Sequence, residues 1–161
     1  MKNSAPVTIR IAESAEEIAQ ARELFQQYGS SLSFPLCFQN FDQELASLPG
    51  KYAMPNGRLL LAFVDGVPAG CGALRALDRQ ACEMKRLYVR PEHKGRGIGR
   101  QLAERLIAEA KRIGYTHMRL DTIPAQMMEA NHLYLSLGFQ EIPPYYQSTQ
   151  PGTRYLELAL G

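Results

Sequence analysis

The stretch "RPEHKGRGIGRQL", Arg90–Leu102, combines three glycines with five basic residues and leads directly into an amphipathic helix. Apolar residues recur at helical spacing from Ile98 to Ile113, and Gly114 follows as a helix-terminating residue. A strand-like run precedes the turn. The order of strand, glycine-rich turn and helix is a general layout for holding phosphate, because main-chain N–H groups and the helix N-terminus attract an anion. The alternative is a plain connection that needs glycine only for a left-handed bend.

The spacing of the glycines argues against two common nucleotide-binding motifs. A Walker loop requires Lys-Ser or Lys-Thr, and the chain contains neither pair. The Rossmann fingerprint requires G-x-G-x-x-G, whereas Gly95, Gly97 and Gly99 alternate with single residues. The turn also lies beyond residue 90, which leaves too little chain for a doubly wound nucleotide-binding half.

Composition indicates one soluble globular domain over residues 1–161. Nine of the 18 Lys and Arg residues lie in 83–112, against four acids there, so the positive charge is local and suggests an anionic partner. Cys37, Cys71 and Cys82 lack the spacing of a metal site or a disulfide framework, which predicts reduced thiols and no metal. No apolar run suggests a membrane span or a signal peptide, so we expect a cytoplasmic location.

Periodicity predicts a fold of mixed α/β class. Ser14 and Glu17 form a capping box for a helix to about Tyr28, and a short helix follows Asn40. Further helices are expected from Ile98 to Ile113 and over 125–137. Strands are expected at 7–11, 58–64, 69–77, 82–89, 116–123, 139–142 and 154–160. This order favours one mixed sheet with helices on both faces.

Two segments resemble the GNAT superfamily of N-acetyltransferases: "CEMKRLYVRPEHKGRGIGRQLAERLIAEA" and "ANHLYLSLGF". The family signature is Arg or Gln, two residues, Gly, any residue, then Gly or Ala. Gly97 and Gly99 fill its glycine positions, while Lys94 replaces Arg or Gln. The resemblance implies a mostly antiparallel central sheet, with acetyl-CoA between splayed fourth and fifth strands. It also implies a coenzyme A-binding core over 81–139 and an acceptor-site lid over 28–57.

The resemblance assigns the pyrophosphate to the N–H groups of the glycine-rich turn and the pantetheine arm to the backbone of the preceding strand. Met127 stands where the family has an asparagine, and Asn131, on the same helix face as Tyr134, is a candidate substitute. The implied coenzyme A-binding residues are Leu87, Tyr88, Val89, Lys94, Gly95, Arg96, Gly97, Ile98, Gly99, Arg100, Asn131 and Tyr134.

In the family, a neutral amine attacks the thioester directly, so no covalent nucleophile is required. Tyr134 matches the tyrosine of an A-x-x-x-Y-x-x-x-G-F run and is the candidate acid for the departing thiolate; the alternative is a packed aromatic. Glu83, eleven residues before Lys94, is the candidate base, acting directly or through water. The alternatives are a solvated residue paired with Lys85 or Arg86, and a water chain as base.

The expected function is transfer of acetyl from acetyl-CoA to a primary amine on a small or amino-acid-like molecule. The alternatives are acetylation of a protein or peptide amine and a non-catalytic acyl-CoA-binding regulatory module. Nucleic-acid binding is not expected, since the basic segment lacks interleaved exposed aromatics; a homodimer is common in the family. Aromatic residues either wall the acceptor site or simply pack the core, and Asp121 and Thr122 are candidates to face it. These aromatics are Tyr28, Phe34, Phe38, Phe41, Tyr52, Tyr145 and Tyr146.

Overall fold

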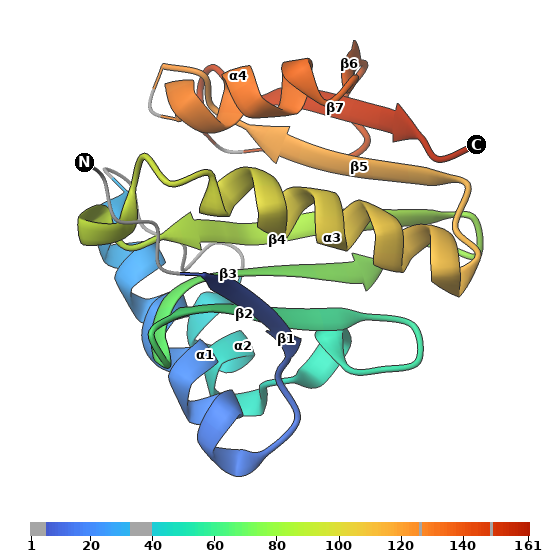
Figure 1. Ribbon diagram of the computed structural model, residues 1–161. Helices are drawn as coiled ribbons and strands as arrows, with labels where there is room; N and C mark the ends of the chain where they lie inside the picture. Colours follow the sequence, from blue (N-terminus) through green and yellow to red (C-terminus); the bar gives the residue numbers. More distant parts are fainter. Residues whose placement is uncertain (1–5, 33–39, 126, 149) are drawn as a thin grey trace.

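A computed structural model describes residues 6–32, 40–125, 127–148 and 150–161, which build a central sheet with helices against both faces (Figure 1). The elements follow the predicted order. They are β1 (Val7–Ile11), α1 (Ala15–Ser31), α2 (Phe41–Ser47), η2 (Gly50–Tyr52), β2 (Arg58–Val64), β3 (Val67–Ala76), β4 (Ala81–Val89), η3 (Pro91–His93), α3 (Ile98–Ile113), β5 (His117–Thr122), α4 (Met128–Ser136), β6 (Gln140–Ile142) and β7 (Arg154–Ala159).

The sheet has seven strands in the order β1-β2-β3-β4-β5-β7-β6. Within the described ranges every neighbouring pair is antiparallel except β4 and β5, which run parallel. The predicted mixed, mostly antiparallel sheet is therefore confirmed. Parallel neighbours need a long crossover, and α3 supplies it by carrying the chain from the end of β4 back to the start of β5.

Each face of the sheet has its own core. The strand β2 is apolar on both sides: Leu60 faces the cluster that α3 and α4 share, while Leu59 faces the cluster formed with α1 and α2. Leu102 and Leu106 of α3 are fully buried against the first face. This burial on both sides explains why "RLLLAFV" reads as a continuous apolar run rather than an alternating one.

Local sequence signals set most boundaries. The Ser14 Oγ accepts a hydrogen bond from the Glu17 N–H at 3.1 Å, and a Glu17 carboxylate oxygen accepts one from the Ser14 N–H at 3.1 Å, which confirms the capping box. The largest differences from expectation are at two helix ends: α1 continues to Ser31, and α4 begins only at Met128. Asn40 precedes α2 as predicted, but its side chain makes no capping bond.

The turn between β3 and β4 fixes their register. The Asp78 carboxylate accepts hydrogen bonds from the N–H groups of Gln80 and Ala81, at 2.7 and 2.8 Å, which closes the turn. Arg75 consequently lies directly opposite Glu83. This cross-strand pair lies at one wall of the candidate site.

Candidate active site

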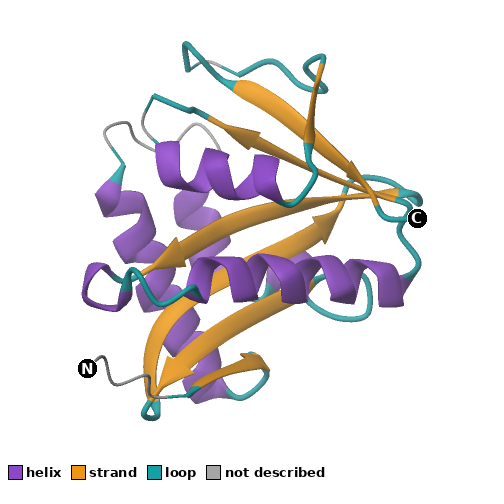
Figure 2. Ribbon diagram, turned by 45° about the horizontal axis from the view of Figure 1, so that its top comes forward, coloured by secondary structure: helices purple, strands orange, loops and turns teal. Residues whose placement is uncertain are grey.

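The strands β4 and β5 separate partway along their length. They pair only over Ala81–Glu83 and His117–Arg119, although β4 continues to Val89 and β5 to Thr122. They start side by side and diverge toward their carboxyl ends (Figure 2). The second half of β4 therefore presents a main-chain edge inside the sheet that β5 does not cover. The splay expected between the fourth and fifth strands is present.

The glycine-rich turn lies just beyond this edge. Gly95 and Gly97 have φ angles of +84° and +77°, which strongly favour glycine, and α3 begins at the next residue. The N–H of Lys94 is already bonded to the Pro91 carbonyl at 3.2 Å. In the part of the chain that the structure describes, no hydrogen bond is recorded for the amides of residues 95–100. Six donors thus remain available at the positive end of a 16-residue helix, which suits an anion.

The side chains around the turn add charge and anchor it. The Lys94 Nζ lies 3.8 Å from a carboxylate oxygen of Glu129, and the exposed Arg100 pairs with Glu104 at 3.5 Å. Arg96 is also exposed. At the start of the turn, the Arg90 side chain donates to Gln27 at 3.1 Å and to Glu23 at 3.2 Å, both on α1. This anchor was not predicted, and it holds the turn against a helix on the opposite face of the sheet.

The three predicted residues of β4 divide between the two faces. Leu87 and Val89 pack against the α3 cluster, whereas Tyr88 points to the other face, where its ring meets that of Tyr28 at 6.2 Å between centroids. A ligand at the edge of β4 would therefore meet these residues through their main-chain groups, as the prediction requires.

Tyr134 lies on α4 and is 8% exposed, with its ring 5.8 Å from that of Phe139. Burial raises the pKa of Tyr134 well above 10, and the nearby Tyr28 and Asp121 raise it further, so the phenol keeps its proton at neutral pH. Within the described ranges no hydrogen bond is recorded for this hydroxyl. Asn131 is half-buried one turn earlier on α4, and no hydrogen bond is recorded for its side chain there. Both assignments stay predictions.

Glu83 is 2% exposed, so it is not the solvated strand residue of the alternative reading. Arg75 donates to one of its carboxylate oxygens at 2.9 Å, and the Tyr145 hydroxyl donates to the other at 2.6 Å. The Lys85 Nζ lies 3.9 Å from the oxygen that Arg75 holds. Arg86 pairs with Glu44 at 2.8 Å.

A β-bulge after Lys85 explains how neighbouring charged residues reach one side of the sheet. Two residues of β4, Arg86 and Leu87, lie where β3 supplies only Gly72, and Arg86 has a φ of +60°. In a regular strand Arg86 would point away from Lys85. Instead its guanidinium is buried on the α2 side and donates two hydrogen bonds to Glu44, at 2.8 and 2.9 Å. For a residue other than glycine, this conformation costs about 1–2 kcal/mol, which the buried ion pair offsets.

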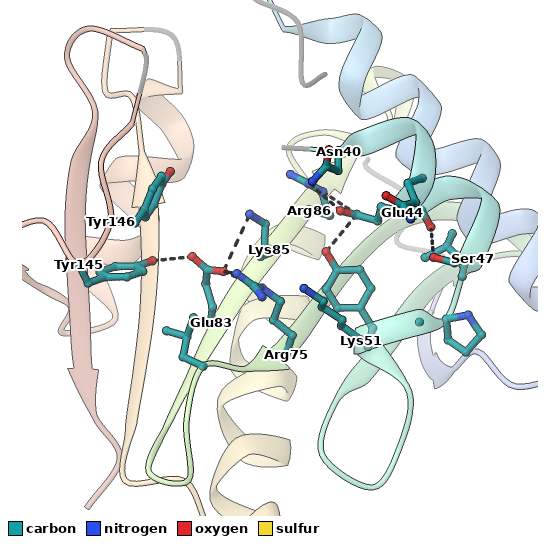
Figure 3. Close-up of a pocket in the computed structure, with 16 residues that line it drawn as sticks. Asn40, Glu44, Ser47, Lys51, Arg75, Glu83, Lys85, Arg86, Tyr145 and Tyr146 are labelled. Carbon is teal, nitrogen blue, oxygen red and sulfur yellow. Dashed lines mark hydrogen bonds and ion pairs between the residues drawn. The ribbon is translucent and has the colours of Figure 1, made fainter. Parts of the chain in front are cut away.

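These side chains line a pocket of about 600 Å³ on the α2 side of β4 (Figure 3). Figure 3 shows Arg75, Lys85 and Glu83 between Tyr145 and Tyr146 on one side and Glu44 on the other. The size is typical of a small-molecule site. The lining residues are Asn40, Gln43, Glu44, Ser47, Leu48, Pro49, Gly50, Lys51, Tyr52, Arg75, Leu77, Glu83, Lys85, Arg86, Tyr145 and Tyr146.

The aromatic residues divide between the pocket and the core. Tyr145 and Tyr146 line the pocket, and their hydroxyls bond to Glu83 and Asp121, so the loop before β7 is tied to both diverging strands. Phe41 and Tyr52 are buried in the α1 and α2 core, although Tyr52 also borders the pocket. Tyr28 packs against the same core, and Thr122 is buried. Phe34 and Phe38 lie outside the described residues, as does Cys37.

Comparison with known proteins identifies the family. Residues 18–139 match the family described as "Acetyltransferase (GNAT) family". The chain belongs to the GNAT family. An uncharacterized N-acetyltransferase of Schizosaccharomyces pombe is 35% identical to this GNAT chain over 99% of both chains. The predicted family and the acyltransferase class are therefore confirmed.

Solved structures share the fold of this chain. A GNAT acetyltransferase from Staphylococcus aureus has a TM-score of 0.80 at 18% identity, covering 97% of this chain and 100% of the other, which concerns the fold alone. An acetyltransferase from Salmonella typhimurium, solved with its cofactor acetyl-CoA, has a TM-score of 0.71 at 26% identity, covering 99% of this chain and 95% of the other.

In the described ranges, no group of three or more His, Cys, Asp and Glu side chains is arranged to hold a metal ion. Among the same residues, no helix combines the length and the apolar character needed to cross a bilayer. Cys71 and Cys82 are both free thiols and buried.

The Glu44–Arg86 pair makes a testable contribution to stability. Burial alone would raise the pKa of Glu44, but the hydrogen bonds and charge of Arg86 outweigh it and hold that pKa below its ordinary value of 4.5. Replacing Glu44 with Gln leaves a buried guanidinium without its carboxylate, which lowers the free energy of unfolding by about 3 kcal/mol at neutral pH. Urea unfolding measures the difference.

The pH dependence separates this ion pair from a general packing effect. A lowered pKa in the folded state means that the pair stabilises the protein above pH 4.5 and loses its contribution as the pH falls further. The stability gap between the wild type and E44Q should therefore shrink in acid. Asp42→Asn, an exposed change on the same helix, is the control and should show no comparable gap. Equal stability of E44Q and the wild type at neutral pH would contradict the assignment.

Proposed function

We propose that this GNAT protein transfers an acetyl group from acetyl-CoA to the primary amine of a small molecule, by direct attack within a ternary complex. One observation carries the proposal: among the described residues, no internal partner bonds the six main-chain amides of residues 95–100, which lie beyond the uncovered edge of β4. The similar Salmonella structure, solved with acetyl-CoA, supports the choice of acyl donor.

In this proposal the turn holds the pyrophosphate through the amides of Gly95–Arg100, and Lys94 adds positive charge. The pantetheine arm pairs with the main chain of Leu87–Val89, in the place that β5 leaves uncovered. Asn131 lies one turn before Tyr134 on α4 and contributes a side-chain contact. Residues 81–139 then form the coenzyme A-binding core, and 28–57 cover the acceptor.

Glu83 and Tyr134 supply the proton transfers. Acetyl-CoA provides the acetyl group as an activated thioester, and the amine nitrogen bonds to its carbonyl carbon as the carbon–sulfur bond breaks. Glu83 accepts the proton that the amine loses, and Tyr134 donates a proton to the departing sulfur. A proton then returns from Glu83 to Tyr134 through water. The products are the acetylated amine and the free thiol, so protons and charge balance.

We also propose a cytoplasmic location, in keeping with the free thiols of Cys71 and Cys82. The homodimer stays a prediction, which light scattering in solution would test.

The direct test mixes the protein with acetyl-CoA and a panel of small primary amines and amino acids, and measures thiol release. We expect turnover with at least one small amine and an acetylated product of the corresponding mass. Turnover only with peptides or protein lysines would assign the acceptor to macromolecules. Coenzyme A binding without turnover on any amine would indicate a regulatory module. Either result would overturn the proposal.

Tyr134→Phe tests the acid. The change removes one hydroxyl from a buried ring and leaves the packing intact, so kcat should fall by about 100-fold while the affinity for coenzyme A changes little. Steady-state kinetics and calorimetry measure the two quantities. Unchanged turnover would leave Tyr134 as a packed aromatic of the α4 core.

Gly97→Ala tests the anion site. No atom lies within 4 Å of an added Cβ, so the cost comes only from the left-handed backbone, about 1–2 kcal/mol, or roughly tenfold in coenzyme A affinity if the turn relaxes. Gly99→Ala is the control, because its Cβ would make ordinary contacts at 3.7 and 3.9 Å with Val89 and Leu133. Equal affinity of both variants and the wild type, measured by calorimetry, would mean that the phosphates bind elsewhere.

A further inference from the structure

Glu83, the proposed base, offers little free surface to a substrate. The residue is 2% exposed, and protein donors already hold both oxygens of its carboxylate. The Arg75 guanidinium approaches Oε1 through Nε and through Nη2, each at 2.9 Å. The Tyr145 hydroxyl donates to Oε2 at 2.6 Å, a length typical of a strong hydrogen bond from a hydroxyl to a carboxylate. An amine in the pocket therefore meets a base whose two oxygens are engaged.

Tyr145 differs from Arg75 in what it can do with a proton. Tyr145 is half-buried and lines the pocket, and its hydroxyl points at Glu83 (Figure 3). A guanidinium has no lone pair with which to accept a proton, whereas a tyrosine hydroxyl can accept one proton and donate another. Of the two side chains that donate hydrogen bonds to Glu83 in the described part of the chain, only Tyr145 can therefore pass a proton on to it.

Three neighbours hold the ring of Tyr145 in place. The Arg119 guanidinium lies over the face of the ring, 5.7 Å from its centroid. The rings of Tyr146 and Tyr155 meet it in edge-to-face geometry, with centroids 5.6 and 5.4 Å away. These contacts fix the hydroxyl against Glu83 in advance, which lowers the cost of orienting a proton-transfer group during the reaction.

The hydroxyl keeps its proton at neutral pH. Burial raises the pKa of Tyr145, and the neighbouring Glu83 carboxylate raises it further. A phenolate that waits for the proton of the amine is therefore not formed. The Tyr145 oxygen accepts a proton only while it gives up its own, and Glu83 is the acceptor already in place.

We propose that the Tyr145 hydroxyl relays the proton of the attacking amine to Glu83. The inference rests on the proposed function, which supplies the amine, the thioester and the base. As nitrogen bonds to the acetyl carbon, an N–H bond breaks, its electron pair stays on nitrogen and the proton bonds to the Tyr145 oxygen. The Tyr145 O–H bond breaks in the same step, and that proton bonds to Oε2 of Glu83. Tyr145 ends the step neutral, with one proton as before.

Tyr145→Phe removes the relay and keeps the ring. With the best amine of the panel, we expect kcat to fall about 100-fold and KM to change by no more than about twofold. Tyr155→Phe, which removes the same atom from a ring packed against that of Tyr145, is the matched control and should keep kcat within about twofold. Unchanged turnover in Y145F would overturn the relay, whereas no turnover in the wild type would overturn the proposed function instead.

A solvent isotope measurement separates a relay from a hydrogen bond that only positions Glu83. Single-turnover rates are measured in mixtures of light and heavy water. A relay moves one proton more than direct transfer does, so the rates of the wild type and Y155F should reflect one more transferred proton than the rate of Y145F. The same dependence in Y145F and the wild type would reduce Tyr145 to a positioning residue and overturn the relay.

The double variant Y145F/E83Q tests whether both residues act on one path. If Tyr145 passes protons only to Glu83, the double variant should be no more than about twofold slower than E83Q alone. Unchanged affinity for coenzyme A shows that the variants are folded. Losses that multiply would mean that Tyr145 acts independently of Glu83, which would also overturn the relay.

Discussion

The strand β4 is hydrogen-bonded to β3 over nearly its whole length, but to β5 only as far as Glu83. An uncovered strand edge inside a sheet is normally a liability, because its N–H and C=O groups invite pairing with another chain. Here the edge ends at the glycine-rich turn. The arrangement of the candidate site depends on this separation, because the uncovered edge runs from Glu83, which lines the pocket, to that turn.

The bulge at Arg86 decides what the pocket contains. Without the extra residue, Arg86 would point into the apolar core beneath α3, where no counter-charge would meet it. With it, Glu83, Lys85 and Arg86 share one face, and the pair formed with Glu44 fixes α2 against β4. The ion pair therefore fixes the part of the pocket that Glu44 and Arg86 line. The left-handed backbone at Arg86 is the local cost in free energy of that arrangement.

Much of this architecture could be predicted from the sequence, because its signals are local. The capping box at Ser14, the glycine-rich turn and the periodicity of α3 need no tertiary information. The pairing of Arg75 with Glu83 could also be predicted from the sequence, since the turn around Asp78 sets the register of β3 and β4. The bulge was not predictable, because strand alternation places Arg86 on the wrong face. The ion pair between Glu44 and Arg86 was not predictable either, because it depends on the bulge and joins residues 42 positions apart.

The anion site that we propose at the start of α3 consists of main-chain groups rather than side chains. Every residue except proline carries the same amide, so substitutions between Gly95 and Arg100 can alter the charge around the site without removing its donors. The proposed site therefore depends on the conformation of the backbone, which can stay the same while the amino-acid sequence changes extensively. In this proposal, chains that share little identity with this one bind a diphosphate in the same way, provided that they retain the left-handed turn before the helix.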